Sequence, residues 1–174
     1  MAACNKSVLV TVTVAVSMML ICCHVSEGAA NDLISKVCSE AKNPSVCESV
    51  LRPVRGSKGA DLPSLAKTAL EQGIDVVEQS LAAITLIRGD CTDFYTDAID
   101  SLYYGRENLV SRDWDNLYNN AVDALESIAN CDDILTAEPG DVEPPAIAQA
   151  DLTAEDAVYV VIAVAKYGRI TKFI

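Results

Sequence analysis

The stretch LISKVCSEAKNPSVCESVLRP (residues 33–53) sets two cysteines, Cys38 and Cys47, on either side of Asn43-Pro44. The two short segments that flank the Asn-Pro have apolar residues at helical spacing. A helical hairpin of this size buries too little apolar surface to be stable alone, so the cysteine pair is interpreted as a covalent clasp. That interpretation requires an oxidising compartment.

The first thirty residues have the pattern of an export signal. Lys6 supplies the positive start, residues 8–23 are an almost unbroken apolar run, and small residues follow it. A membrane anchor is the less favoured alternative, because the run is shorter than the roughly 20 apolar residues that span a bilayer. We therefore expect residues 1–28 to be a signal peptide and residues 29–174 to be a secreted, extracellular domain without a membrane segment.

Removal of the signal would leave an even set of cysteines, which in a secreted chain indicates disulfides. Four cysteines allow three pairings, and the sequence alone does not choose among them. Spacing favours the local pair and leaves the other two residues for a second bridge. The expected disulfide residues are Cys38, Cys47, Cys91 and Cys131.

The same cleavage would remove His24, which is the single histidine of the chain. Without imidazole, Ser-His and Cys-His nucleophilic catalysis and histidine-ligated metal sites are excluded in their usual forms. We expect no cofactor, no metal and no enzymatic activity. A carboxylate-based hydrolase stays an alternative, although it would need a paired acid and base in a cleft, and most acids here fall on predicted outer faces.

The charge of the chain, −12 in total, is unevenly distributed. Residues 29–88 carry seven acids and seven bases, whereas residues 90–156 carry seventeen acids against Arg106 and Arg112 alone. Such a domain repels nucleic acid and anionic membranes and attracts a basic partner.

Three segments after the hairpin have the apolar spacing of long helices. The first begins after a start signal at Asp61 and is predicted to end near Arg88. The second has Asp90 or Thr92 as a plausible cap. The third, with Asp113 at its N-cap, carries the most regular apolar stripe in the sequence.

A proline-containing loop is predicted at residues 132–150, followed by a fourth helix. Thr153 with Asp156 resembles a capping box, and Gly168 suits a C-terminal stop. The segment VYVVIAVA (residues 158–165) is rich in β-branched residues and could form a strand on propensity alone. Length, caps and the lack of another strand candidate favour a helix at the centre of the domain.

Four long helices with mostly short connections predict an all-α fold, an up-down-up-down four-helix bundle with the disulfide-clasped helical hairpin as an N-terminal appendage. Cys91 opens the second bundle helix and Cys131 closes the third. In an antiparallel pair these ends are neighbours, so a bridge between them is geometrically reasonable.

Three ordered motifs carry a family resemblance: LISKVCSEAKNPSVC, YTDAIDSL leading into SRDWDNL and then a cysteine, and QADLTAEDAVYVVI. From about Leu33 to about Val164 the chain resembles the plant invertase/pectin methylesterase inhibitor family, and within it most resembles the pectin methylesterase inhibitors. The resemblance implies sequential disulfides and a secreted four-helix bundle of the cell wall, or apoplast. It also implies a one-to-one complex that covers the pectin-binding cleft of the esterase.

Inhibition of plant acid invertase is the alternative within the family. Invertase inhibitors of this type carry a Pro-Lys-Phe segment near the start of the third bundle helix, and this chain has Trp114-Asp115-Asn116 there. The pectin side is therefore favoured. An alternative of another class is a non-inhibitory structural or calcium-binding wall protein that uses residues 138–143, but EPGDVE lacks the alternating oxygen spacing of a calcium loop.

The resemblance also implies that acids on the second bundle helix face the partner enzyme. The matching positions are Asp93, Asp97 and Asp100, whose spacing of four and three puts them on one exposed stripe. A merely solvated face is the alternative for each of them.

Overall fold

The structure of the protein is a computed structural model, and it describes residues 33–52, 61–86, 89–136 and 143–172. Regular secondary structure in these ranges is entirely helical. The predicted signal peptide, residues 1–28, lies outside the described residues. Among the helices that are described, none is long and apolar enough to cross a membrane.

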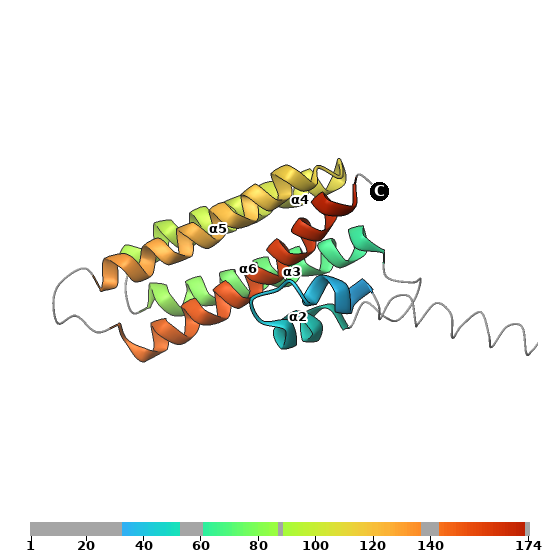
Figure 1. The fold of residues 1–174 in the computed structure, drawn as a ribbon. Helices are drawn as coiled ribbons and strands as arrows, with labels where there is room; N and C mark the ends of the chain where they lie inside the picture. Colours follow the sequence, from blue (N-terminus) through green and yellow to red (C-terminus); the bar gives the residue numbers. More distant parts are fainter. Residues whose placement is uncertain (1–32, 53–60, 87–88, 137–142, 173–174) are drawn as a thin grey trace, which may run out of the picture.

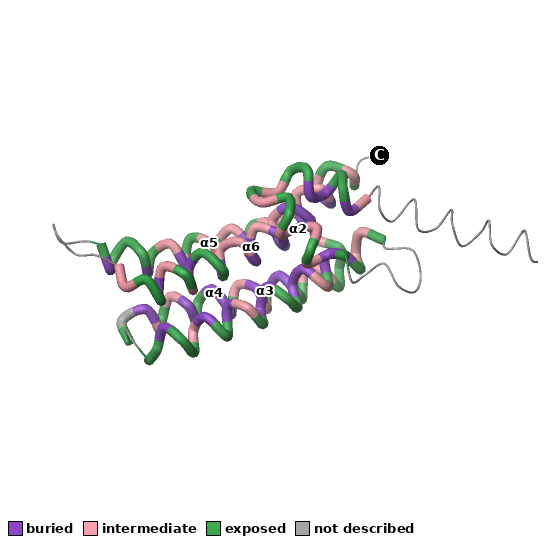
Figure 2. The backbone as a smooth tube through the Cα atoms, turned by 90° about the horizontal axis from the view of Figure 1, so that it is seen from below, coloured by how far each residue is buried: buried purple, intermediate pink, exposed green. Residues whose placement is uncertain are grey.

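Four long helices make up the bundle in the described part of the chain: α3 (Leu62–Thr85), α4 (Thr92–Val110), α5 (Trp114–Leu135) and α6 (Pro145–Thr171). Consecutive helices pack side by side, and α6 returns to pack against α3, which closes the ring (Figure 1). The buried side of each helix faces the other three (Figure 2). The predicted up-down-up-down bundle is confirmed.

The starts of α3 and α5 follow the predicted side-chain caps. Asp61 accepts a hydrogen bond from the Ser64 amide at 2.9 Å, and Asp113 accepts one from the Asn116 amide at 3.2 Å. The predicted cap of α4 at Asp90 or Thr92 is wrong, because the N-cap is Cys91 and makes no side-chain capping bond. A 3₁₀ turn, Gly89–Cys91, precedes it. The disulfide to α5 fixes this cysteine, so the helix begins there without a polar cap.

The ends of α6 also differ from the prediction. The helix begins at Pro145, because a proline with its fixed φ suits the first helical turn. The Thr153 hydroxyl therefore caps nothing and donates to the Gln149 carbonyl, 2.6 Å away, inside the helix. Gly168 does not stop α6, which continues to Thr171; the glycine is needed because the ring of Trp114 occupies the space of a side chain there.

The β-branched segment of α6 lies at the centre of the bundle, as predicted. Its valines are almost fully buried, with exposures of 0–1% at Val158, Val160, Val161 and Val164. Burial of each such side chain stabilises the fold by about 1.5–3 kcal/mol relative to an exposed position. Tertiary packing thus outweighs the strand propensity of these residues.

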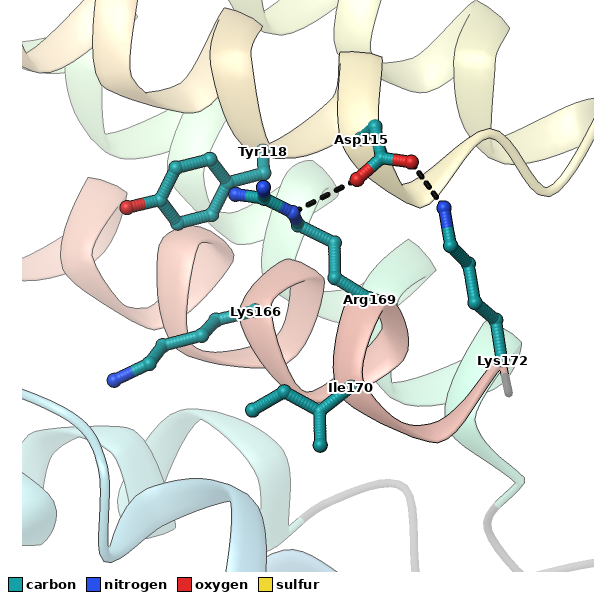
Figure 3. Close-up of a pocket in the computed structure, with 6 residues that line it drawn as sticks. All are labelled: Asp115, Tyr118, Lys166, Arg169, Ile170 and Lys172. Atoms are coloured by element: carbon teal, nitrogen blue, oxygen red, sulfur yellow. Dashed lines mark hydrogen bonds and ion pairs between the residues drawn. The ribbon is translucent and has the colours of Figure 1, made fainter. Parts of the chain in front are cut away.

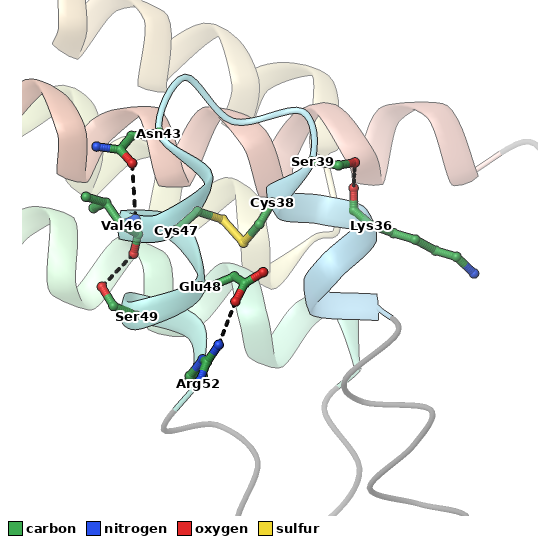
Figure 4. The surroundings of a disulfide bond; sticks show 9 residues. All are labelled: Lys36, Cys38, Ser39, Asn43, Val46, Cys47, Glu48, Ser49 and Arg52. Carbon is green, nitrogen blue, oxygen red and sulfur yellow. Dashed lines mark hydrogen bonds and ion pairs between the residues drawn. A yellow bond between two sulfur atoms is a disulfide. The ribbon is translucent and has the colours of Figure 1, made fainter.

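The N-terminal hairpin consists of a helical segment, residues 33–38, and α2 (Pro44–Leu51). A disulfide joins Cys38 to Cys47, whose Cα atoms are 5.5 Å apart (Figure 4). The Asn43 side chain caps α2 by accepting from the Val46 amide at 3.4 Å. The clasp predicted from the cysteine spacing is present.

The hairpin packs on α3 and α6, and its apolar residues join the main core. Ion pairs fasten it to α6: Lys42 lies 3.1 Å from Glu155, and Lys166 lies 3.0 Å from Glu40. The Lys42 ammonium also stands 4.3 Å from the centre of the Tyr159 ring. These exposed pairs contribute little stability each, so their main effect is to set the position of the hairpin.

Candidate partner-binding surface

The α4–α5 hairpin is fixed at both ends. At one end a disulfide joins Cys91 to Cys131, with a Cα–Cα distance of 5.1 Å. At the other end, Arg112 adopts a positive φ of 56°, and the Asp113 amide donates to the Asn108 carbonyl at 2.9 Å. The two helices therefore form a rigid platform, and the sequential pairing agrees with the one that the spacing favours.

A buried tyrosine ties this platform to the rest of the bundle. Tyr95 lies one turn after Cys91, is fully buried, and donates its hydroxyl hydrogen to Asp151 of α6. The pKa of the Tyr95 hydroxyl is raised, mainly because the group is buried and secondly because it donates a hydrogen bond to the Asp151 carboxylate. The hydroxyl therefore stays a donor throughout the physiological range.

The predicted acidic stripe lies on the solvent face of α4. Asp93, Asp97 and Asp100 are all exposed, and their spacing aligns them along one side of the helix. Within the described residues, none of the three carboxylates has an ion-pair or side-chain hydrogen-bond partner. The structure thus brings the three predicted residues together and leaves their charges available.

Tyr104 continues the same stripe, and the sequence analysis did not single it out. Its side chain is 61% exposed, which is unusual for a large aromatic residue, and Glu107 follows it one turn later. The signal that could have found Tyr104 is its spacing of four residues from Asp100 and seven from Asp97. We call Asp93, Asp97, Asp100 and Tyr104 the α4 stripe.

The cation of α4 is directed away from the stripe. The Arg106 guanidinium lies 4.6 Å from the centre of the Tyr103 ring, and the Tyr103 hydroxyl donates to Glu78 of α3 at 3.0 Å. This contact holds Arg106 on the side of α4 that faces α3. The negative charge of the stripe is therefore not neutralised from within its own helix.

The outer side of α5 adds to this negative charge. It exposes Asp123, Glu126 and Asp133, and the helix contains neither lysine nor arginine. The solvent face of the α4–α5 hairpin is therefore strongly acidic, and such a surface attracts cationic macromolecules over distances of about a Debye length.

A different surface lies where α5 begins and α6 ends (Figure 3). A cavity of about 520 Å³ is lined there by Asp115, Tyr118 and the basic residues of the last turns of α6. Asp115 accepts hydrogen bonds from Arg169 at 2.9 Å and also from Lys172. These two cations hold the pKa of the Asp115 carboxyl below its ordinary value, and Lys172 has the larger effect. The Arg169 guanidinium lies 4.4 Å from the centre of the Tyr118 ring.

Metal-binding geometry is missing from the described residues, in which no cluster of three or more His, Cys, Asp or Glu side chains could hold an ion. Of the loop considered for calcium, residues 138–142 lie outside the described residues, and Glu143 alone is placed.

Comparison with known proteins adds independent observations. The family model described as plant invertase/pectin methylesterase inhibitor matches residues 32–165. A pectinesterase inhibitor from Actinidia deliciosa is 30% identical over 148 residues, covering 78% of this chain and 79% of that protein.

Solved structures show the same fold. A mutant form of a pectin methylesterase inhibitor from Arabidopsis superposes with a TM-score of 0.64 at 23% identity, over 76% of this chain and 95% of that one. A second inhibitor structure, from Arabidopsis thaliana, gives 0.54 at 22% identity, over 78% and 95% of the two chains.

Proposed function

The chain belongs to the plant invertase/pectin methylesterase inhibitor family, and on that premise we propose that it inhibits a pectin methylesterase by docking through the α4 stripe. The observation that carries the docking site is the row of three exposed, unpaired carboxylates on a helix braced by a disulfide. Secretion to the cell wall and a one-to-one complex over the pectin-binding cleft complete the proposal.

The stripe has the properties of a protein-binding surface. Its three carboxylates can bind a partner without first breaking an ion pair or hydrogen bond within the described part of the protein. Its exposed Tyr104 can serve as an aromatic anchor, a kind of residue that dominates the binding energy of many interfaces. The disulfide and the tight turn at Arg112 fix the platform beforehand, which lowers the entropy cost of association.

The charge of the stripe specifies the chemistry of the partner. A cationic enzyme surface would be drawn to the acidic face of the α4–α5 hairpin, which speeds the encounter and makes binding weaker at high salt.

Invertase inhibition is less well supported by the local structure. At the place where invertase inhibitors carry Pro-Lys-Phe, Trp114 is 8% exposed and packs against Gly168, while Asp115 is held by Arg169 and Lys172. Residues engaged in this way would have to break several contacts before they could enter another protein's active site.

A carboxylate-based hydrolase is also disfavoured. In the described residues, the carboxyl group with the most strongly raised pKa is that of Glu143, which interacts with Asp151, and the oxygens Glu143 Oε1 and Asp151 Oδ2 are buried. A substrate could not reach those atoms, so we infer that the protein acts by binding and not by catalysis.

The test is an inhibition assay of the oxidised protein, residues 29–174, against a plant pectin methylesterase and a plant acid invertase. We expect inhibition of the esterase alone, and weaker inhibition as salt is raised. Inhibition of invertase with no effect on esterases would overturn the proposal, as would hydrolysis of pectin by the purified protein itself.

A further inference from the structure

Two acidic side chains have buried oxygens without a partner at the end of the bundle where α6 begins. Asp151 is only 7% exposed; one of its oxygens accepts from the Tyr95 hydroxyl, and the other, Oδ2, has no hydrogen-bond partner among the described residues. Oε1 of Glu143 is also buried and also has no hydrogen-bond partner among the described residues. A buried carboxylate oxygen without a donor is costly, so two of them in interacting residues need an explanation.

One proton shared by the two carboxyl groups would give both oxygens a hydrogen-bond partner. Asp151 acts on the Glu143 carboxyl through a side-chain hydrogen bond and through its charge, and two carboxylates that interact in this way cannot both be ionised without strong repulsion. If one of them is protonated, it becomes a donor to the other, and both orphaned oxygens gain a partner.

We propose that Glu143 and Asp151 hold one proton between them and form an acid-closed joint, which fastens the chain just before α6 to α6 itself and, through Tyr95, to α4. This inference concerns the folded protein alone and goes beyond the proposed function, because it requires no partner enzyme. The joint adjoins the start of α4, where Asp93 and Asp97 flank Tyr95 in the sequence.

Most of the charged groups around the pair are acidic, and Lys42 of the N-terminal hairpin is a cation that reaches them, 3.1 Å from Glu155. Asp132 faces it from α5, Glu155 acts on the same cluster from α6, and α3 contributes the Ser80 hydroxyl, which donates to the Ala150 carbonyl at 3.2 Å. Burial and then the neighbouring Asp151 raise the pKa of Asp132.

No cation from α5 or the first half of α6 can neutralise this cluster, because the sequence has neither lysine nor arginine between Arg112 and Lys166. Loss of the shared proton would therefore leave two ionised carboxylates, each with a buried oxygen, beside the charge of Asp132.

The direction of the pH effect follows from the protonation of Glu143. Burial, the hydrogen bond to Asp151 and the Asp151 charge raise the pKa of Glu143 from an ordinary 4.5 to about 7. The folded protein thus holds this proton more tightly than the unfolded chain does. The joint's contribution to stability is complete below the unfolded pKa and is lost as pH rises through the folded one.

The experiment compares urea unfolding of the oxidised protein with that of Glu143→Gln, from about pH 4.5 to about pH 8. The glutamine amide donates to Asp151 as the protonated acid does, but it cannot titrate. Relative to this variant, the wild-type folding equilibrium constant should fall at least about tenfold as pH rises, and Glu126→Gln, an exposed control on α5, should follow the wild type. If the free energy of unfolding depends on pH in the same way for the wild type and Glu143→Gln, the proposal is wrong.

A second measurement does not depend on the variant. An NMR titration of the Glu143 side-chain carboxyl in the wild-type protein should give a midpoint near 7, and a midpoint at the ordinary value of 4.5 would refute the shared proton. Neither experiment contains an esterase, so failure here leaves the proposed inhibition untouched, and failure of inhibition leaves the joint untouched.

Discussion

The indole ring of Trp114, at the start of α5, occupies the space where a side chain on Gly168 of α6 would stand. Trp114 is 8% exposed and Gly168 is buried, so the contact joins the two helices at the end of the bundle opposite the Cys91–Cys131 disulfide. The glycine is therefore explained by tertiary packing, since its own helix continues past it.

Replacing this glycine should destabilise the fold. In Gly168→Ala the new methyl group would meet a rigid ring, and we expect the free energy of unfolding to fall by about 1–3 kcal/mol. Alanine's better helix propensity, about 1 kcal/mol, offsets part of this loss. Urea denaturation measures the change, and Gly89→Ala, whose added Cβ would meet no atom within 4 Å, is the control. Equal losses in both variants would contradict the packing explanation.

Charge reversal in the α4 stripe should weaken the proposed complex. In Asp97→Lys/Asp100→Lys we expect the dissociation constant for the esterase to rise by about tenfold or more, mainly through slower association, because rim charges act on encounter rates. The difference should shrink at high salt. Surface plasmon resonance at two salt concentrations gives both rates.

A control with the same change of charge is available on α3. Glu71→Lys/Asp75→Lys alters two exposed acids of that helix and should leave the fold and the binding constant nearly unchanged. If the α3 variant loses as much affinity as the α4 variant, the interface has been placed on the wrong helix.

Tyr104 should act as an anchor of the same surface. Because its ring is exposed in the free protein, Tyr104→Ala should leave stability within about 0.5 kcal/mol of the wild type. Loss of a central aromatic contact should weaken binding by about 1–2 kcal/mol, a roughly fivefold to thirtyfold rise in the dissociation constant. Tyr104→Phe keeps the ring and should retain most of the affinity; a full loss in that variant would assign the effect to the hydroxyl.

The two disulfides should differ in their contributions to stability. By the loop-closure model, removal of the pair Cys38 and Cys47 costs about 2.7 kcal/mol, and removal of Cys91 and Cys131 costs about 3.9 kcal/mol. Double alanine variants are suitable, because all four positions are almost fully buried and alanine adds no unpaired hydroxyl. Chemical denaturation should show the larger loss for the longer loop, and the opposite order would argue against the entropic explanation.

The sequence predicted the elements that depend on local patterns. The caps at Asp61 and Asp113 each rest on a hydrogen bond to an amide three residues ahead, so they could be inferred without the tertiary structure. The exposure of Asp93, Asp97 and Asp100 follows from helical spacing in the same way. Their role toward a partner stays a prediction.

The features that the sequence analysis missed depend on contacts between distant segments. The sequence predicts a helix stop at Gly168, but the glycine is required by an aromatic ring from another helix. The sequence predicts a polar cap for α4, but a disulfide, and not a polar side chain, sets where that helix begins. The Glu143–Asp151 interaction leaves no periodic signal, since Glu143 precedes α6 and lies outside any helix.

The turn at Arg112 has a consequence for proteolysis. An exposed arginine with positive φ between two helices is an accessible position for a trypsin-like protease, and the sequence offers such enzymes no further basic residue until Lys166. A cut after Arg112 would separate the chain into two pieces, yet Cys91 and Cys131 would still hold them together. The nicked molecule would migrate as one species until a reductant is added.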